Sequence, residues 1–230
     1  MTNNPIVKGK LVCVALNDAK QFNAMQAEFS EAPHKGAPTQ PVLYFKPHNT
    51  WSTEGAEVEW AVSGDQAAET MVVGASLAVV FGEACCRVSQ DDALDYVQGY
   101  ALVHDVSLPE KSYYRPDIKG KCLDASAPVG GFIPVASVQD PQALTVVTQV
   151  NDKTVNELPG SQLVRGVAEL ISTISYIMTL QPGDVIAVGF PGQRATVAQG
   201  DRVSSAIFQA DKTKLAELNN RMGQAEESNR

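Results

Sequence analysis

Short runs rich in Val, Ile and Phe recur along the chain, and they constrain its fold more than any other feature. β-branched and aromatic residues favour extended strands over helices. The runs lie at residues 11–16, 42–46, 77–81, 144–150, 185–190 and 203–208. Because these runs outnumber helical patterns and are irregularly spaced, the sequence predicts an α+β domain built mainly from sheet.

Helical patterns are fewer. Across residues 160–182 apolar side chains recur every three to four positions, which is typical of an amphipathic helix, and a Pro-Gly pair then ends it. Ser89 and Asp92 resemble a capping box that opens a short helix. A third helix is expected to begin near Asn17. These helices should flank the sheet.

The length of 230 residues suits one domain with a small appendage. We expect residues 1–210 to form that domain. Residues 211–230 are polar and lack a wide apolar stripe, so the sequence predicts a polar tail there, frayed or disordered.

The formal net charge of −8 argues against a nucleic-acid partner, because phosphate binding needs clustered Lys and Arg. This net charge does not exclude an anionic small molecule that binds in a locally basic pocket. The chain has no long apolar run and its start lacks a signal-peptide pattern, so we expect a cytoplasmic protein with no membrane partner. Cys13, Cys85, Cys86 and Cys122 are interpreted as reduced thiols.

Segments in the same order and with matching gaps resemble the fumarylacetoacetate hydrolase superfamily across residues 8–205. They are Phe45-Lys46-Pro47 with Asn49, residues 77–110, residues 121–130, and residues 180–191 followed by Gly200-Asp201. The resemblance implies a mixed β-sheet fold, a sandwich or roll like the C-terminal domain of that superfamily, with a few flanking helices.

One branch of that superfamily is more similar still. The run from Asp105 to Glu110, then Arg115-Pro116 and Lys121-Cys122, resembles the N-terminal half, or first subunit, of bifunctional isomerase/decarboxylases of homoprotocatechuate (4-hydroxyphenylacetate) degradation. This implies decarboxylation of 5-oxopent-3-ene-1,2,5-tricarboxylate and isomerisation of 2-hydroxyhepta-2,4-diene-1,7-dioate. It also implies a small dicarboxylate or tricarboxylate substrate, and as partner a homologous second subunit or, in a homodimer, a second copy.

The resemblance further implies Mg²⁺ or Mn²⁺, held by a Glu-x-Glu on one strand and an Asp further along. Asp105 takes the place of that Asp, but the family's Glu positions are Gly74 and Ser76. Glu57 and Glu59 resemble the ligand strand, but their spacing is wrong. Glu59 lies 46 residues before Asp105, whereas Ser76 lies 29 residues before it, which matches the family's spacing. One carboxylate holds Mg²⁺ poorly, so we expect metal binding to be weak or absent in this chain.

The resemblance gives catalytic roles to Lys46 and Lys121, whose ammonium groups can bind a carboxylate or transfer a proton. The alternative for each lysine is a solvated surface charge. His104, beside Asp105, is a candidate general base or else a structural hydrogen-bonding residue. Arg115 is a candidate for binding a substrate carboxylate through two hydrogen bonds.

Ser76 and Phe190 complete the predicted substrate-binding set. Phe190 stands where the family has Thr in Gly-Thr-Pro, so a hydroxyl that would touch substrate is missing. Two alternatives to an active subunit stay open. The chain could be a non-catalytic structural partner, or an enzyme of this superfamily that acts on another 2-oxo or enol acid.

Overall fold

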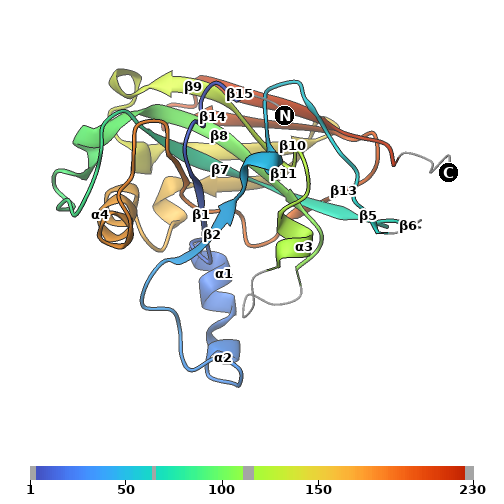
Figure 1. Ribbon diagram of the computed structural model, residues 1–230, viewed down its shortest axis with the longest axis horizontal. Helices are drawn as coiled ribbons and strands as arrows, with labels where there is room; N and C mark the ends of the chain where they lie inside the picture. The colour runs from blue at the N-terminus through green and yellow to red at the C-terminus, as the bar shows by residue number, and fades with distance from the viewer. Residues whose placement is uncertain (1–3, 64–65, 111–116, 226–230) are drawn as a thin grey trace.

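The computed structural model describes residues 4–63, 66–110 and 117–225. Within these residues the strands form a larger sheet, a smaller sheet and a short hairpin, with helices at the margins (Figure 1). The larger sheet pairs β1 with β12 in parallel and β7 with β8 antiparallel, so it is mixed. The predicted α+β class, built mainly from mixed sheet with a few flanking helices, is confirmed.

The larger sheet has the order β2-β1-β12-β7-β8-β9-β3, and β13 also pairs with β7. Its strands are β1 (Leu11–Ala15), β2 (Val42–Lys46), β3 (Trp51–Ser52), β7 (Met71–Phe81), β8 (Val97–Ser107), β9 (Ala127–Pro134), β12 (Val185–Ala187) and β13 (Ala195–Val197). The long strands β7 and β8 form its centre and carry side chains on both faces.

The smaller sheet has the order β11-β10-β14-β15-β4. Its strands are β4 (Glu57–Val58), β10 (Thr145–Val150), β11 (Lys153–Pro159), β14 (Arg202–Phe208) and β15 (Lys214–Met222), while β5 (Val62–Ser63) and β6 (Gln66–Ala67) form the hairpin. This sheet covers one face of the larger sheet, and buried side chains of both sheets share one core cluster.

The described helices are short. They are α1 (Ala19–Ala24), α2 (Gln26–Phe29), α3 (Ile118–Lys121) and α4 (Val167–Ile177), with 3₁₀ turns η1 (His48–Thr50), η2 (Ala93–Tyr96), η3 (Val135–Ser137), η4 (Pro141–Ala143) and η5 (Gly160–Gln162). As its periodicity predicts, α4 buries Leu170, Ile171 and Ile174. None of the described helices has the length and apolar character that crossing a bilayer requires.

Alternation along β7 and β8 separates two layers of the core. Leu77 and Leu102 face the smaller sheet, whereas Ala78 and Val103 face the opposite side, together with Phe190. Successive side chains of a strand point to opposite faces, so a shift of one residue would exchange the two layers. The second layer includes Leu11 and Cys13 of β1, the strand that leads toward the projection formed by α1 and α2 (Figure 1).

The predicted tail is wrong for residues 214–222, which form strand β15 and pair with β14. Leu218, Asn220 and Met222 are buried at alternate positions, because β15 fills a place inside the smaller sheet between β14 and β4. The alternation of apolar and polar residues along this segment is short and interrupted by polar residues at buried positions. For this reason its sequence resembled that of a frayed segment. Residues 226–230 of that prediction lie outside the described part of the chain.

Two of the sequence motifs have structural roles. Asp184 accepts hydrogen bonds from the backbone N–H groups of Lys10 (2.6 Å) and Gln181 (2.7 Å), which ties the start of β1 to the turn before β12. The Ser89 hydroxyl donates to the Asp92 carboxylate at 2.6 Å and accepts from its backbone N–H at 3.2 Å. That capping motif precedes the 3₁₀ turn η2 and not a longer helix.

Candidate functional site

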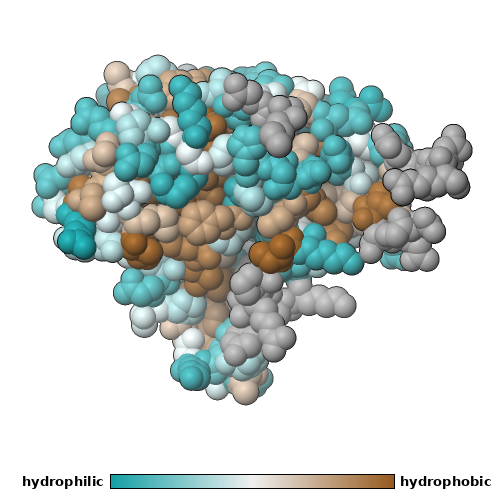
Figure 2. Space-filling model, viewed as in Figure 1, coloured by the Kyte–Doolittle hydropathy of each residue, from teal (hydrophilic) through white to brown (hydrophobic). Residues whose placement is uncertain are grey.

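A cavity of about 540 Å³ opens between β2, α3 and the loop that follows β12. Apolar side chains gather in the middle of this face, above the projection of α1 and α2 (Figure 2). The charged and aromatic residues that line the cavity include Tyr44, Glu110, Lys121, Phe190 and Arg194. A mainly apolar cavity with a few convergent polar groups is typical of a small-molecule site.

Asp105 is the centre of the polar groups beside this cavity, and it is fully buried on β8. Its Oδ1 lies 2.9 Å from Lys46 Nζ. Its Oδ2 lies 3.1 Å from Lys121 Nζ and 2.6 Å from Arg194 Nη1. The Tyr44 hydroxyl donates a hydrogen bond of 2.6 Å to the same oxygen. One carboxylate therefore holds three cations and a phenol.

The protonation of this cluster follows from burial and charge. Burial alone would raise the pKa of Asp105, but Arg194, Lys46 and Lys121 outweigh it and hold that pKa well below its usual value. Burial, reinforced by the negative charge of Asp105, raises the pKa of Tyr44 well above its usual value. Asp105 is therefore an anion, and the Tyr44 phenol keeps the proton that it donates.

Lys46 and Lys121 have different surroundings. The Lys46 ammonium is fully buried, donates to the backbone oxygens of Lys121 (2.6 Å) and Val106 (3.3 Å) and to the Ser126 hydroxyl (3.1 Å), and does not line the cavity. Lys121 lines the cavity, and its Nζ lies 3.1 Å from Glu110 Oε2. Of the two predicted catalytic lysines, the structure places only Lys121 at the cavity.

Arg194 is a site residue that the sequence did not identify. It lies in the loop between β12 and β13, where its Nη1 also donates to the backbone oxygen of Asp105 at 3.1 Å. Its Cζ lies 5.0 Å from the centroid of the Phe190 ring, which is within the range of a cation–π contact. A charged residue shortly after the Gly189-Phe190-Pro191 motif was the available signal.

The prediction of His104 as a catalytic residue is wrong. Adjacent residues of a strand point to opposite faces, so His104 points away from Asp105 toward the smaller sheet. Its Nε2 lies 2.9 Å from the Ser205 hydroxyl on β14, and the ring is fully buried. Burial lowers the pKa of His104 to about 4, and an interaction with Asn220 offsets this only in part. The other role considered for His104, that of a structural hydrogen-bonding residue, fits this position.

The predicted substrate-binding residues are only partly brought together. Phe190 lines the cavity. Ser76 does not line it, since its buried hydroxyl donates to the Leu77 backbone oxygen at 2.7 Å and accepts from Gly189 N–H at 3.2 Å. Ser76 therefore holds the loop in place, which corrects its predicted role. Arg115 lies outside the described residues.

The residues present do not fit a divalent cation. Both oxygens of Asp105 already face cations, Lys46 at Oδ1 and Lys121 with Arg194 at Oδ2, and the residues at positions 74 and 76 are not carboxylates. Glu57 and Glu59 are exposed at the edge of the smaller sheet. Across the residues described, no three His, Cys, Asp or Glu side chains gather in a way that could hold a metal ion.

Comparisons with known proteins give consistent results. The sequence model of a family described as "Fumarylacetoacetate (FAA) hydrolase C-terminal" matches residues 10–223. The homoprotocatechuate catabolism bifunctional isomerase/decarboxylase of Escherichia coli is 38% identical over 197 residues, which cover 86% of this chain and 44% of that protein. The chain thus spans less than half the length of that relative.

Two further relatives match this chain over most of their own length. The mitochondrial oxaloacetate tautomerase of Bos taurus is 32% identical over 202 residues and is covered to 86%, as is this chain. The crystal structure of fumarylpyruvate hydrolase from Pseudomonas aeruginosa in complex with Mn²⁺ and pyruvate has a TM-score of 0.76 and 25% identity, and it covers 94% of this chain and 90% of its own. The resemblance of the sequence to this superfamily and to its isomerase/decarboxylase branch is confirmed.

Proposed function

From the premise that this chain belongs to the fumarylacetoacetate hydrolase family, we propose that it is one half of a 5-oxopent-3-ene-1,2,5-tricarboxylate decarboxylase and 2-hydroxyhepta-2,4-diene-1,7-dioate isomerase in aromatic catabolism. The observation that carries the proposal is the cluster at Asp105, where Lys121 and Arg194 are held at the wall of a mainly apolar cavity. Its metal site is degraded, so Mg²⁺ or Mn²⁺ has no tight place in this chain.

Two cations at the cavity wall can bind an anionic ligand. Lys121 and Arg194 line the cavity together with the carboxylates of Glu110 and Asp117, so the formal charges of its wall balance. The formal net charge of the whole chain is −8. A dicarboxylate or tricarboxylate would bind through the two cations, and its carbon chain fits against apolar walls.

Both reactions pass through a dienolate, so the same residues serve them. Isomerisation removes the proton of the 2-hydroxyl group and adds a proton to C5 of the substrate. Decarboxylation breaks a C–CO₂ bond, leaves its electron pair in the dienolate, and ends with protonation of the dienolate oxygen, which gives the 2-hydroxydiene that the isomerisation uses. Lys121 stabilises this negative charge through its ammonium group, gives a proton to the dienolate and recovers one from the 2-hydroxyl group of the substrate, while Asp105 and Tyr44 orient its ammonium group.

The proposed partner is a homologous second subunit. It corresponds to the part of the Escherichia coli relative that this chain does not match, and it would pair with this chain across a pseudo-two-fold axis. In its absence a homodimer takes that place. In the heteromeric arrangement the second subunit keeps all three carboxylates in its own site, and the divalent cation binds mainly there.

A second candidate function follows from the oxaloacetate tautomerase, which is similar to this chain over nearly its whole length. Tautomerisation of oxaloacetate also exchanges a proton between an enol oxygen and carbon. The same cavity then acts on another 2-oxo or enol acid. The remaining alternative is a non-catalytic structural partner, whose cavity residues have no effect on turnover.

The deciding experiment compares Lys121→Met with Lys119→Met, a control on the same short helix whose side chain is exposed and does not line the cavity. The chain is assayed alone and with the homologous second half, by following the ultraviolet absorbance of 2-hydroxyhepta-2,4-diene-1,7-dioate. We expect Lys121→Met to lower turnover at least ~100-fold and Lys119→Met to leave it unchanged.

The other outcomes separate the alternatives. Turnover by the pair that survives Lys121→Met in this chain supports the structural partner. A chain that leaves the dienoate unchanged but ketonises the enol of oxaloacetate, and loses that activity in Lys121→Met, supports the second candidate. Circular dichroism of each variant checks that the fold is retained.

A further inference from the structure

We propose that Arg194 is the cation that binds the carboxylate of a 2-oxo or enol acid in this cavity, in the place that a divalent metal takes elsewhere in the family. This inference rests on the proposed function, because it assigns a ligand class to the same cavity. It explains the residues at which this chain departs from the family pattern by the presence of Arg194. It also implies that the ligand binds without metal.

The first support is the space beside Asp105. Gly74 lies directly opposite Asp105 in the pairing of β7 with β8, at a position where the family has Glu. A Cβ atom added at Gly74 would lie 3.4 Å from Pro191 Cδ, 3.5 Å from Phe190 Cβ and 3.6 Å from Arg194 Cγ. A carboxylate side chain there would extend into the space that the Phe190–Arg194 loop occupies. Glycine and Arg194 are therefore complementary.

The second support is how firmly Arg194 is held. Its Nη1 donates to Asp105 Oδ2 at 2.6 Å and to the Asp105 backbone oxygen at 3.1 Å, and its Nη2 lies 3.5 Å from the Tyr44 hydroxyl. The guanidinium packs against the Phe190 ring, and its side chain is only 10% exposed while it lines the cavity. A cation fixed in advance at a cavity wall loses little entropy when an anion binds.

The third support is that the departures from the family pattern meet at this loop. Gly74 leaves room for the Arg194 side chain. Phe190, in place of Thr, supplies the ring on which the guanidinium packs. Ser76, in place of Glu, accepts a hydrogen bond from Gly189 N–H and so fixes the start of the loop. One replacement of the cation thus accounts for three substitutions at once.

Charge balance agrees with this replacement. A divalent ion with three carboxylates carries a net charge of −1, whereas Arg194 with Asp105 is neutral, so the two arrangements differ by only one unit of charge. A planar guanidinium also matches the geometry of a carboxylate, which it binds through parallel N–H donors. The expected ligand is a 2-oxo acid whose carboxylate contacts Arg194 and whose second anionic end lies toward Lys121.

The test measures binding and not turnover, with oxalate as the probe because it resembles the enolate of a 2-oxo acid. The chain is freed of metal on a chelating resin and titrated with oxalate by calorimetry. We expect wild-type protein to bind without metal, Arg194→Gln to bind at least ~10-fold more weakly, and Arg194→Lys to lie between them. Arg202→Gln, an exposed arginine on β14, is the matched control and should bind as wild type does.

A reverse variant gives an independent readout. Gly74→Glu, Ser76→Glu and Arg194→Ala together should restore a Mn²⁺ site, detected by electron paramagnetic resonance, and should make oxalate binding depend on Mn²⁺. If Arg194→Gln does not fold, Arg194→Lys, which keeps a positive charge beside Asp105, decides the question by its weakened affinity.

Three results would overturn the inference: oxalate binding by wild type that requires added Mg²⁺ or Mn²⁺, affinity in Arg194→Gln or in a folded Arg194→Lys equal to wild type, and no oxalate binding at all. These are distinguishable from failure of the proposed function. Metal-free binding through Arg194 without turnover of the dienoate would reject that function and keep this inference, and turnover without such binding would do the reverse.

Discussion

Gly74 and Asp105 are direct neighbours across the antiparallel strands β7 and β8, and only one of them carries a carboxylate. At directly opposite positions side chains lie close together on the same face of a sheet. A second carboxylate at residue 74 would therefore share a cation with Asp105. Without it, Asp105 has become the common partner of Lys46, Lys121 and Arg194, and the predictions below begin from that change.

Asp105→Asn should lower the free energy of unfolding by ~3–5 kcal/mol, because it leaves the fully buried Lys46 ammonium without its counter-ion. Urea denaturation followed by circular dichroism measures this. The matched control is Asp152→Asn, which removes a partner of Arg202 from a largely exposed pair and should cost about 0–1 kcal/mol. Equal, small losses in both variants would contradict a buried ionic cluster.

His104 should make the fold less stable in acid. Its pKa is about 4 in the folded chain and 6.5 when exposed, so the unfolded state takes up a proton first as the pH falls. The stability that comes from keeping His104 neutral is complete above pH 6.5 and is lost as the pH falls toward 4, by on the order of 3 kcal/mol.

Urea denaturation of wild type and His104→Asn between roughly pH 7 and pH 4.5 separates this effect from the protonation of carboxylates, which both proteins share. The variant should lose distinctly less stability over that interval. Parallel curves for the two proteins would show that His104 does not titrate in this way.

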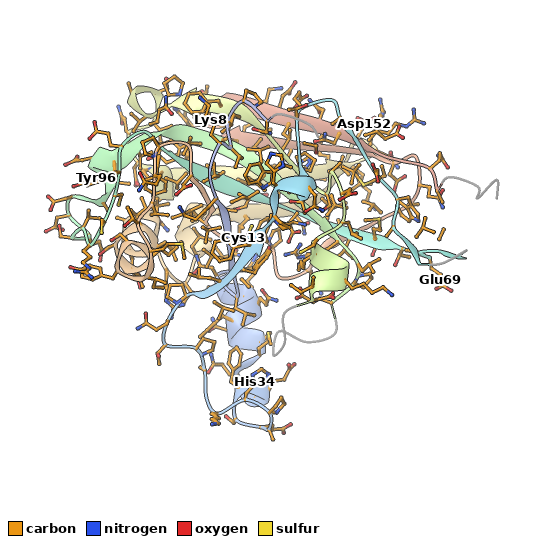
Figure 3. The ribbon with its side chains drawn as sticks, in the orientation of Figure 1. Lys8, Cys13, His34, Glu69, Tyr96 and Asp152 are labelled. Carbon is orange, nitrogen blue, oxygen red and sulfur yellow. The ribbon has the colours of Figure 1, made fainter. Side chains whose placement is uncertain are left out.

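The thiols should differ sharply in reactivity. Cys13 is fully buried, and burial raises its pKa to about 12, whereas Cys86 is exposed. Cys13, labelled in Figure 3, lies in the interior near the start of the α1–α2 projection. An aromatic disulfide reagent should react rapidly with the native protein, and Cys86→Ser should remove that rapid phase while Cys13→Ser leaves it.

Denaturant should then make all four thiols reactive, since the structure holds them as free cysteines. Rapid loss of the Cys13 thiol in native protein would mean that the cluster around Asp105 opens readily to solvent.

Leu218→Ala should lower the free energy of unfolding by ~2–5 kcal/mol, because Leu218 is fully buried on β15 and its side chain packs over Gly130. Lys214→Ala, at the exposed start of the same strand, should change it by less than ~0.5 kcal/mol. Thermal and urea unfolding measure both. Similarly small changes in both variants would contradict a packed strand at residues 214–222 and would indicate a loosely attached tail.

The sequence predicted well those features that depend on local pattern. Runs of β-branched residues predicted β1, β2, β10, β12, β14 and the second half of β7, and a period of three to four residues predicted α4. Such patterns did not predict β8, β9, β11 or β15. In β15, burial at alternate positions is shared by Leu218, Asn220 and Met222. A polar residue buried in a strand cannot be told from an exposed one until its partner strand is known.

The site divides in the same way. The sequence by itself determined that Asp105 stands without the glutamates expected at Gly74 and Ser76, because residue types and spacing along one chain suffice for that. Only the tertiary structure decided that His104 points away from the cavity and that Arg194 takes up the vacant side of Asp105. The physical reason is that strand register sets which face a residue occupies, and Arg194 reaches Asp105 across 89 residues of chain through a loop without a repeating pattern.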